Sequence, residues 1–187
     1  MAIAKRKKRF FEVDIPIIKK STQLQAFEKE ELNNRLIQYD LTRMLRGKGT
    51  ILQLITKVNK ESATSIPRQL KLMPFYLKRM VRKGTSYVED SFTTDSQDAQ
   101  LKIKPFLITR RKVSRRIRNA LRTQTKLELE KYANEKQSSE IFEDILKNQL
   151  QKKLSLTLKK IYPLSLCEIK FIKVMKFSEK KALKDEE

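Results

Sequence analysis

Short stretches in which apolar and polar residues alternate predict β-strands near the start of the chain. In residues 11–15, apolar residues alternate with acids, and Pro16 predicts the end of that strand. The same alternation returns in residues 37–41 and 51–58, on either side of a turn that contains Gly47. Two strands around a glycine-containing turn predict a β-hairpin.

Farther along the chain, the apolar period becomes that of α-helices, with extended segments between them. The polar residues 19–34 are predicted to form only a connection. Helices are predicted with Pro74 in the first turn and an end before Gly84, over residues 111–133, from residue 139 onward, and through residues 150–161. Extended segments are predicted at residues 86–94, 101–109 and 167–175. In the last of these, Ile169 and Phe171 are expected to close the core.

The predicted helix over residues 111–133 separates an apolar face from a basic face. At about 100° per residue, its apolar stripe contains Val113, Ile117, Ala120, Leu121, Gln124 and Leu127. The opposite face carries Arg111, Arg115, Arg118, Arg122 and Lys126. Like charges at i, i+4 cost an isolated helix roughly 0.2–0.5 kcal/mol per pair, so the row is favourable chiefly against phosphates. The alternative is a solvated charged face, but such faces normally mix both signs.

The charge balance of the whole chain supports the first interpretation. Its 187 residues include 43 Lys and Arg against 22 Asp and Glu, which gives a formal charge of +21. A small domain needs a net charge of only about 2–8 for solubility, so a polyanion is the expected partner. No acid occurs between Glu61 and Glu89 or between Asp98 and Glu128. The chain is therefore predicted to bind nucleic acid.

The composition excludes most catalytic sites and metal centres. The absence of histidine removes imidazole bases and ligands, and the single Cys167 cannot form an internal disulfide or a cysteine-rich cluster. A Walker loop needs a glycine five residues before Gly47, where this chain has Thr42. We therefore expect no enzyme activity, no cofactor, no metal and no small-molecule substrate.

Two other interpretations each follow from a single feature. Glu89, Asp90, Asp95 and Asp98 form an acidic cluster that could hold magnesium in a nuclease, but they flank a predicted turn, where Asp is favoured for backbone reasons. The basic amphipathic helix could lie on an anionic membrane, but its apolar face lacks Trp and Phe. No apolar stretch reaches the roughly 18 residues of a membrane span, and no signal core follows the basic N-terminus. We expect a cytoplasmic protein without a membrane partner.

Recognition of bases has less support than recognition of phosphates. The adjacent aromatic pairs Phe10-Phe11 and Phe75-Tyr76 are not spaced like a stacking platform. We interpret them as one core residue beside one edge residue. The sequence thus gives more support to phosphate contacts than to base stacking.

Several short motifs follow one another in a specific order. Residues 9–16 read RFFEVDIP and residues 34–41 read NRLIQYDL. Basic helical segments follow at residues 70–83 and 116–121, and KIYPL at residues 160–164 precedes EIK and IKV. The order and spacing of these motifs resemble the archaeal and eukaryotic small-subunit ribosomal protein family S3Ae, also called eS1. The resemblance covers about residues 9–176.

The resemblance implies an α+β fold with a mixed-strand β-barrel-like core, basic helices packed outside it and a C-terminal strand. We predict a basic arm at residues 1–9, a single ribosomal-protein domain at residues 10–176 and a charged tail at residues 177–187. Members of the family are structural constituents of the small ribosomal subunit in the cytoplasm. They bind small-subunit rRNA and neighbouring proteins in the platform near the mRNA exit, where mRNA is a further candidate partner. From the residues alone, a free-standing nucleic-acid-binding protein of RNA processing or chromatin is the alternative.

The candidate RNA-binding residues are basic side chains of the N-terminal arm, the glycine-containing turn, the first helix and the long helix. They are Lys5, Arg6, Lys7, Lys8, Arg9, Arg46, Lys48, Lys78, Arg79, Arg82, Lys83, Arg110, Arg111, Arg115, Arg118, Arg122 and Lys126. The many arginines matter because a guanidinium fork can bind one phosphate through two hydrogen bonds, whereas an ammonium acts as a point charge.

Overall fold

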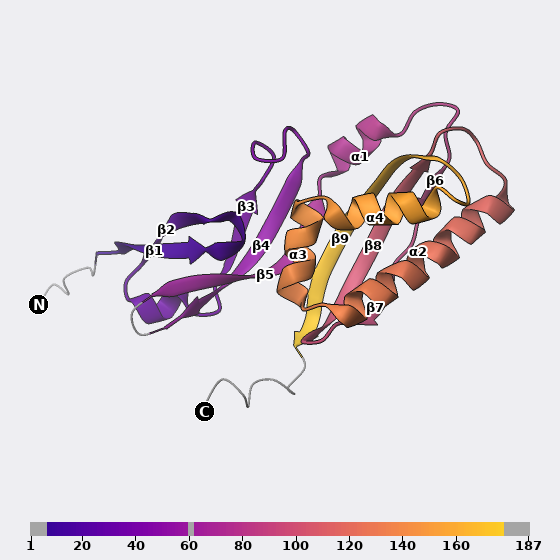
Figure 1. The fold of residues 1–187 in the computed structure, drawn as a ribbon. Coiled ribbons are helices and arrows are strands. Elements are labelled where there is room, and N and C mark those ends of the chain that lie inside the picture. The colour runs from indigo at the N-terminus through magenta and orange to yellow at the C-terminus, as the bar shows by residue number, and fades with distance from the viewer. Residues whose placement is uncertain (1–6, 60–61, 178–187) are drawn as a thin grey trace, which may run out of the picture. The chain divides into compact units, whose positions relative to one another are not determined.

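The computed structural model describes residues 7–59 and 62–177 (Figure 1). Lys5, Arg6 and the predicted tail beyond Phe177 therefore lie outside the described residues. The chain divides into two compact units, residues 1–39 with 52–68 and residues 40–51 with 69–187. A single domain over residues 10–176 stays a prediction.

The first unit contains a hairpin of two antiparallel strands. β1 (Arg9–Ile15) pairs with β2 (Lys20–Ala26), with Arg9 opposite Ala26 and Ile15 opposite Lys20. A short 3-10 helix, η1 (Pro16–Ile18), ends the first strand, as the proline predicts. The prediction that residues 19–34 only connect is wrong. They contain β2 and a second 3-10 helix, η2 (Lys29–Leu32). Because β2 is held by backbone pairing and buries little besides Ala26, its polar sequence does not indicate a strand.

The predicted hairpin around Gly47 is present. β3 (Leu36–Asp40) pairs with β4 (Thr50–Val58), and Gly47 adopts a φ of 82° in the turn between them, a conformation that favours glycine. β4 also pairs with β5 (Ala63–Leu72), a strand that has no counterpart among the predicted elements. β5 reaches β1 through one parallel pair, Asp14 opposite Thr64. β4 and β5 each contribute residues to both compact units.

Two long antiparallel strands form the centre of the second unit. β8 (Ala99–Thr109) and β9 (Leu164–Phe177) pair along their whole length, and β9 also pairs with the end of β5. β6 (Tyr87–Glu89) and β7 (Phe92–Asp95) both pair with β8. Over the described residues, the strands make one mixed, nine-stranded sheet that is not closed. The α+β class and the C-terminal strand are confirmed, and the expected barrel-like core takes the form of an open sheet.

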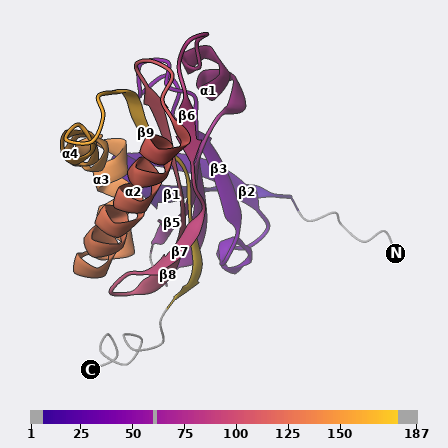
Figure 2. The same ribbon diagram turned by 90° about the vertical axis from the view of Figure 1, so that its right-hand side faces the viewer.

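Three helices lie against one face of β8 and β9 (Figures 1 and 2). They are α2 (Arg115–Glu135), α3 (Ser138–Leu146) and α4 (Gln149–Leu158). A fourth helix, α1 (Pro74–Met80), has its proline in the first turn as predicted, and its Tyr76 and Leu77 share an apolar cluster with Phe106 and Ile108 of β8. The helices thus present their outer sides to solvent while the sheet supports them from within.

The long helix α2 differs from its prediction in its start and in its buried face. It starts at Arg115 because Ser114 caps it, with the Ser114 hydroxyl accepting from the Ile117 N–H. Its buried residues are Leu121, Thr125, Leu129 and Ala133. Leu127, predicted to be core, is 46% exposed. The prediction failed because Thr125 looks polar, whereas its hydroxyl donates to the Leu121 carbonyl within the helix and can be buried.

The C-terminal end of α2 is fixed to α3 by a group of three polar side chains. Tyr132 and Lys136 both donate to the Asp144 carboxylate, and Lys136 also donates to the Tyr132 hydroxyl. Burial would raise the pKa of Asp144, but the hydrogen bonds from Lys136 and Tyr132 outweigh it and hold that pKa below its ordinary value. The pKa of Lys136 is raised, chiefly because its ammonium donates to Asp144. These contacts fix the C-terminal end of α2 relative to α3.

Candidate nucleic-acid interface

The arginine-rich start of α2 forms one side of a hollow in the second unit. The hollow has a volume of about 740 Å³ and is lined by Tyr87 of β6 and, from α2, by Arg115, Arg116, Arg118, Asn119 and Arg122. All of these α2 side chains are exposed. Among the described residues that line the hollow, none is acidic. Three of the predicted candidates, Arg115, Arg118 and Arg122, are therefore brought together, and Arg116 joins them.

The position of these arginines at the helix start is unfavourable unless an anion is bound. The N-terminus of a helix carries a partial positive charge, and acidic residues normally occupy it. The first turn of α2 contains no acid and begins with Arg115 and Arg116. Free N–H groups at this end also bind anions. The helix dipole and the guanidinium groups therefore attract the same class of ligand, an anion.

A second group of candidates lies on and after α1. Lys78 and Arg79 are in the last turn of this helix, and Arg82 and Lys83 follow it, all four exposed. Arg79 lies with its guanidinium carbon 5.6 Å from the centre of the Tyr76 ring. Arg79 and Arg46 share the lining of a hollow of about 770 Å³ that Lys152 also lines. Cations that are far apart in the sequence thus line a second hollow.

The remaining exposed candidates lie in other parts of the chain. Lys7, Lys8 and Arg9 belong to the first unit, where the ammonium of Lys8 is 5.5 Å from the Phe27 ring. Arg110 and Arg111 are exposed in the bend that precedes α2. Lys126 is on α2, but its ammonium is 3.8 Å from the Glu130 carboxylate. This nearby negative charge weakens the attraction of Lys126 for a phosphate. These residues do not line the arginine hollow.

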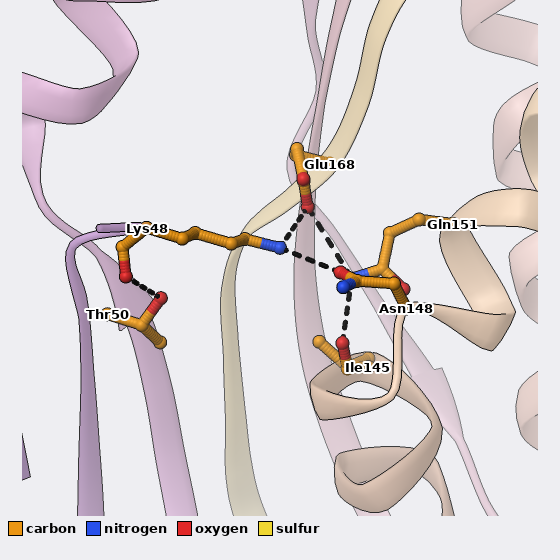
Figure 3. Close-up of polar contacts among 6 residues, drawn as sticks. All are labelled: Lys48, Thr50, Ile145, Asn148, Gln151 and Glu168. Atoms are coloured by element: carbon orange, nitrogen blue, oxygen red, sulfur yellow. Dashed lines mark hydrogen bonds and ion pairs between the residues drawn. The ribbon is translucent and has the colours of Figure 1, made fainter. Parts of the chain in front are cut away.

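Lys48 has a structural role that its sequence context does not indicate. Its ammonium lies 2.6 Å from the Glu168 carboxylate of β9 and donates to the Asn148 side-chain oxygen at 3.0 Å (Figure 3). The side chains of Lys48 and Glu168 are only 13% and 11% exposed. Gln151 of α4 donates to the Ile145 carbonyl at 2.9 Å and approaches the same carboxylate at 3.5 Å. With its ammonium paired and its side chain largely buried, Lys48 is less accessible to an anion than the exposed candidates.

Replacement of Lys48 with methionine is expected to destabilise the protein by about 2 kcal/mol, because it leaves Glu168 poorly solvated and without its cation. The double variant Lys48→Met/Glu168→Gln should regain most of that loss, since no buried charge remains. Urea unfolding of both variants measures the difference. Equal stability of Lys48→Met and the parent protein would show that the pair does not hold β9 to the turn.

Besides Arg116, the sequence-based candidates omitted Tyr87, the aromatic residue of this surface. Its ring is 56% exposed and stacks on Phe106 of β8, with ring centres 6.2 Å apart and planes inclined by 25°. The two residues are far apart in sequence and become neighbours because β6 pairs with β8. A weak signal exists in the sequence, since alternation around the apolar Val88 would place Tyr87 and Glu89 on the opposite face of a strand.

The structure also describes the surroundings of the acidic cluster and of Cys167, and the helices that were considered for a membrane. Each acid of the suggested nuclease cluster has a polar partner within the fold: Glu89 with Lys170, Asp90 with the Ser91 N–H, Asp95 with Gln100, and Asp98 with Ser138. Burial raises the pKa of the Cys167 thiol to about 12, which disfavours a reactive thiolate at neutral pH. Within the described parts of the chain, no helix is long and apolar enough to cross a membrane.

Comparison with known proteins identifies relatives that cover between half and 84% of this chain. Residues 4–178 match the model of the Ribosomal S3Ae family. The chain is 29% identical over 160 residues to the small ribosomal subunit protein eS1 of Pyrobaculum arsenaticum, covering 83% of this chain and 73% of that one. The protein of the same name from Nanoarchaeum equitans is 24% identical over 168 residues, 84% of each chain. The Methanothermobacter thermautotrophicus protein is 32% identical over 95 residues, half of this chain and 49% of its own. The matched residues span nearly the full length of the chain and include every motif on which the resemblance rests. The chain therefore belongs to the Ribosomal S3Ae family.

Proposed function

We propose that this chain is a structural constituent of the small ribosomal subunit that binds small-subunit rRNA. Family membership supports the assignment to the ribosome, since the relatives are named as small ribosomal subunit proteins. The observation that carries the RNA-binding part is the acid-free hollow of Arg115, Arg116, Arg118 and Arg122. Four guanidinium groups at one helix start, with no acid in the lining of the hollow, suit a run of phosphates because each planar fork can bind a phosphate through two hydrogen bonds.

Binding by this surface is electrostatic in origin and structural in purpose. Each arginine that neutralises a phosphate releases a condensed counterion, which supplies affinity. Phosphate contacts carry no sequence information but fix the register of a protein on its RNA. The polar contacts of Tyr132, Lys136 and Asp144 keep α2 in place, so the arginines reach the RNA in one arrangement. The protein would thereby stabilise one RNA shape without chemical change.

The finer parts of the proposal follow from the family resemblance. The protein would act in cytoplasmic ribosomes, in the platform near the mRNA exit, beside neighbouring platform proteins and with mRNA as a further partner. The basic residues Lys78, Arg79, Arg82 and Lys83 would extend the interface beyond α2. No cofactor, metal, substrate or catalytic step belongs to this role.

A sedimentation experiment tests the ribosomal role against that of a free-standing nucleic-acid-binding protein. A tagged copy produced in the native cells is fractionated on sucrose gradients and followed by mass spectrometry. We expect the protein in small-subunit fractions, and retention there after a wash in high salt, because an integral component is held by many contacts at once. Recovery only at the top of the gradient would support the free-standing factor.

A further inference from the structure

Tyr87 separates two hollows of different character. On one side is the arginine hollow. On the other side is an apolar hollow of about 710 Å³, whose lining includes Leu77, Val81 and Phe106. Tyr87 lines both hollows, and its ring is supported from behind by Phe106. The exposed ring therefore borders both hollows and packs against Phe106.

Cations are present on both sides of this ring. The arginine hollow contributes Arg115, Arg116, Arg118 and Arg122. The apolar hollow is lined by Lys71, Lys78, Lys104 and Lys170, with Glu89 as the acid among its lining residues. Lys170 lies 2.9 Å from Glu89 and offsets its charge, and the ammonium of Lys104 lies 5.5 Å from the Phe171 ring. An anion on either side of Tyr87 therefore meets positive charge.

We propose that Tyr87 and its two flanking hollows bind an unpaired segment of RNA, with one base stacked on the Tyr87 ring and the phosphates before and after it held by the arginines and the lysines. This inference rests on the proposed RNA-binding function and names the form of RNA that the surface selects. An unpaired nucleotide has a free base face and a phosphate on each side, which is the arrangement of groups that this surface complements. In a duplex the base faces are covered by neighbouring bases, so a duplex can use the cations but not the ring.

The composition of the surface favours RNA over an acidic peptide. A peptide anchored by an apolar side chain would fit the hollow of Leu77 and Val81, but it would leave the arginine hollow without a ligand. The four arginines lie on the polar side of the ring, where planar forks fit phosphate groups. Stacking on tyrosine also tolerates any base, which suits a protein that recognises shape.

The test compares variants of Tyr87 on two RNA probes with equal numbers of phosphates. The probes are a single-stranded oligouridine and a short RNA duplex, each measured by fluorescence anisotropy across a salt series. We expect Tyr87→Leu to weaken binding of the single strand by roughly 5- to 100-fold, the range for loss of a stacking partner, and to leave duplex binding within about twofold. Tyr87→Phe keeps the ring and should bind as the parent does. Since no charge is removed, the salt slopes should stay unchanged.

The matched control is Phe177→Leu, which removes a ring of similar exposure, 53%, at the end of β9. It should leave binding of both probes unchanged. An oligouridine with abasic sites tests stacking without any protein variant, and the parent protein should bind it as weakly as Tyr87→Leu binds the intact strand.

If Tyr87→Leu weakens neither probe, or both equally, or if the abasic strand binds normally, the inference is wrong while RNA binding stands. If an acidic apolar peptide binds in a Tyr87-dependent way and the strand does not, the surface serves a protein instead. If the parent protein binds neither probe, the proposed function itself fails.

Discussion

Replacing Arg115, Arg116, Arg118 and Arg122 together with glutamine is expected to lower the affinity of the protein for RNA by about 10³-fold near 0.1 M salt. Each phosphate contact contributes about 0.9 to the slope of log affinity against log salt for duplex RNA treated as B-form DNA, and about 0.7 for a single strand. Loss of four contacts should therefore reduce that slope by roughly three units. Filter binding or anisotropy over about 50–400 mM salt measures both quantities, and incorporation into small subunits should fall in parallel.

The free protein should be as stable as the parent or slightly more stable. Glutamine is a good helix former, so the helix itself is not weakened. The change removes repulsion between like charges at i, i+3 and i, i+4 and removes cations from the positive end of the helix dipole. The buried residues Leu121 and Leu129 are untouched. A large drop in melting temperature would contradict the assignment of these arginines to a surface face.

The matched control replaces four exposed lysines with glutamine, Lys131, Lys159, Lys160 and Lys176. It changes the net charge by the same amount, but none of these residues lines the arginine hollow. We expect a loss of affinity below about tenfold, because long-range attraction is screened beyond a Debye length of about 10 Å at 0.1 M salt. If the lysine set is as damaging as the arginine set, general basicity explains binding and α2 is not the RNA-facing element.

Replacing Phe142 with alanine is expected to destabilise the protein by about 3–5 kcal/mol, the range for deletion of a buried aromatic ring. Phe142 of α3 is 0% exposed and lies in the layer of helices against β8 and β9. Phe171→Ala is the matched comparison, since it deletes the same ring from a half-buried site beside Lys104. It should cost about 1 kcal/mol, because less apolar area returns to water. Urea unfolding measures both, and similar losses would mean that Phe171 belongs to the core.

This comparison corrects the expectation that Ile169 and Phe171 both close the core. Ile169 is buried, with 1% exposure, whereas Phe171 lines the apolar hollow. Alternation along β9 would place both on one face, and the pairing shifts register between Lys104 and Pro105 of β8, opposite these residues. A bulge in a partner strand cannot be read from the strand that faces it. The burial of β9 was therefore only partly predictable.

The sequence by itself determined the elements whose pattern is local. The 3.6-residue period and the acid-free row of arginines indicated α2 and its basic face, and proline and glycine placed the ends of β1 and the turn at Gly47. The net positive charge indicated a polyanion as the binding partner, and the ordered motifs from RFFEVDIP to KIYPL indicated the family. These features depend on neighbouring residues, so no knowledge of distant contacts was needed.

The tertiary structure alone decided the features that depend on partners far away in the chain. The polar β2 becomes a strand through backbone pairing with β1, and Lys48 pairs with a carboxylate 120 residues later. Tyr87 becomes a supported, exposed ring because strand pairing sets it on Phe106. The physical reason is the same in each case. Hydrogen bonds and ring contacts across a sheet are set by strand order and register, and a local pattern of apolar and polar residues specifies neither.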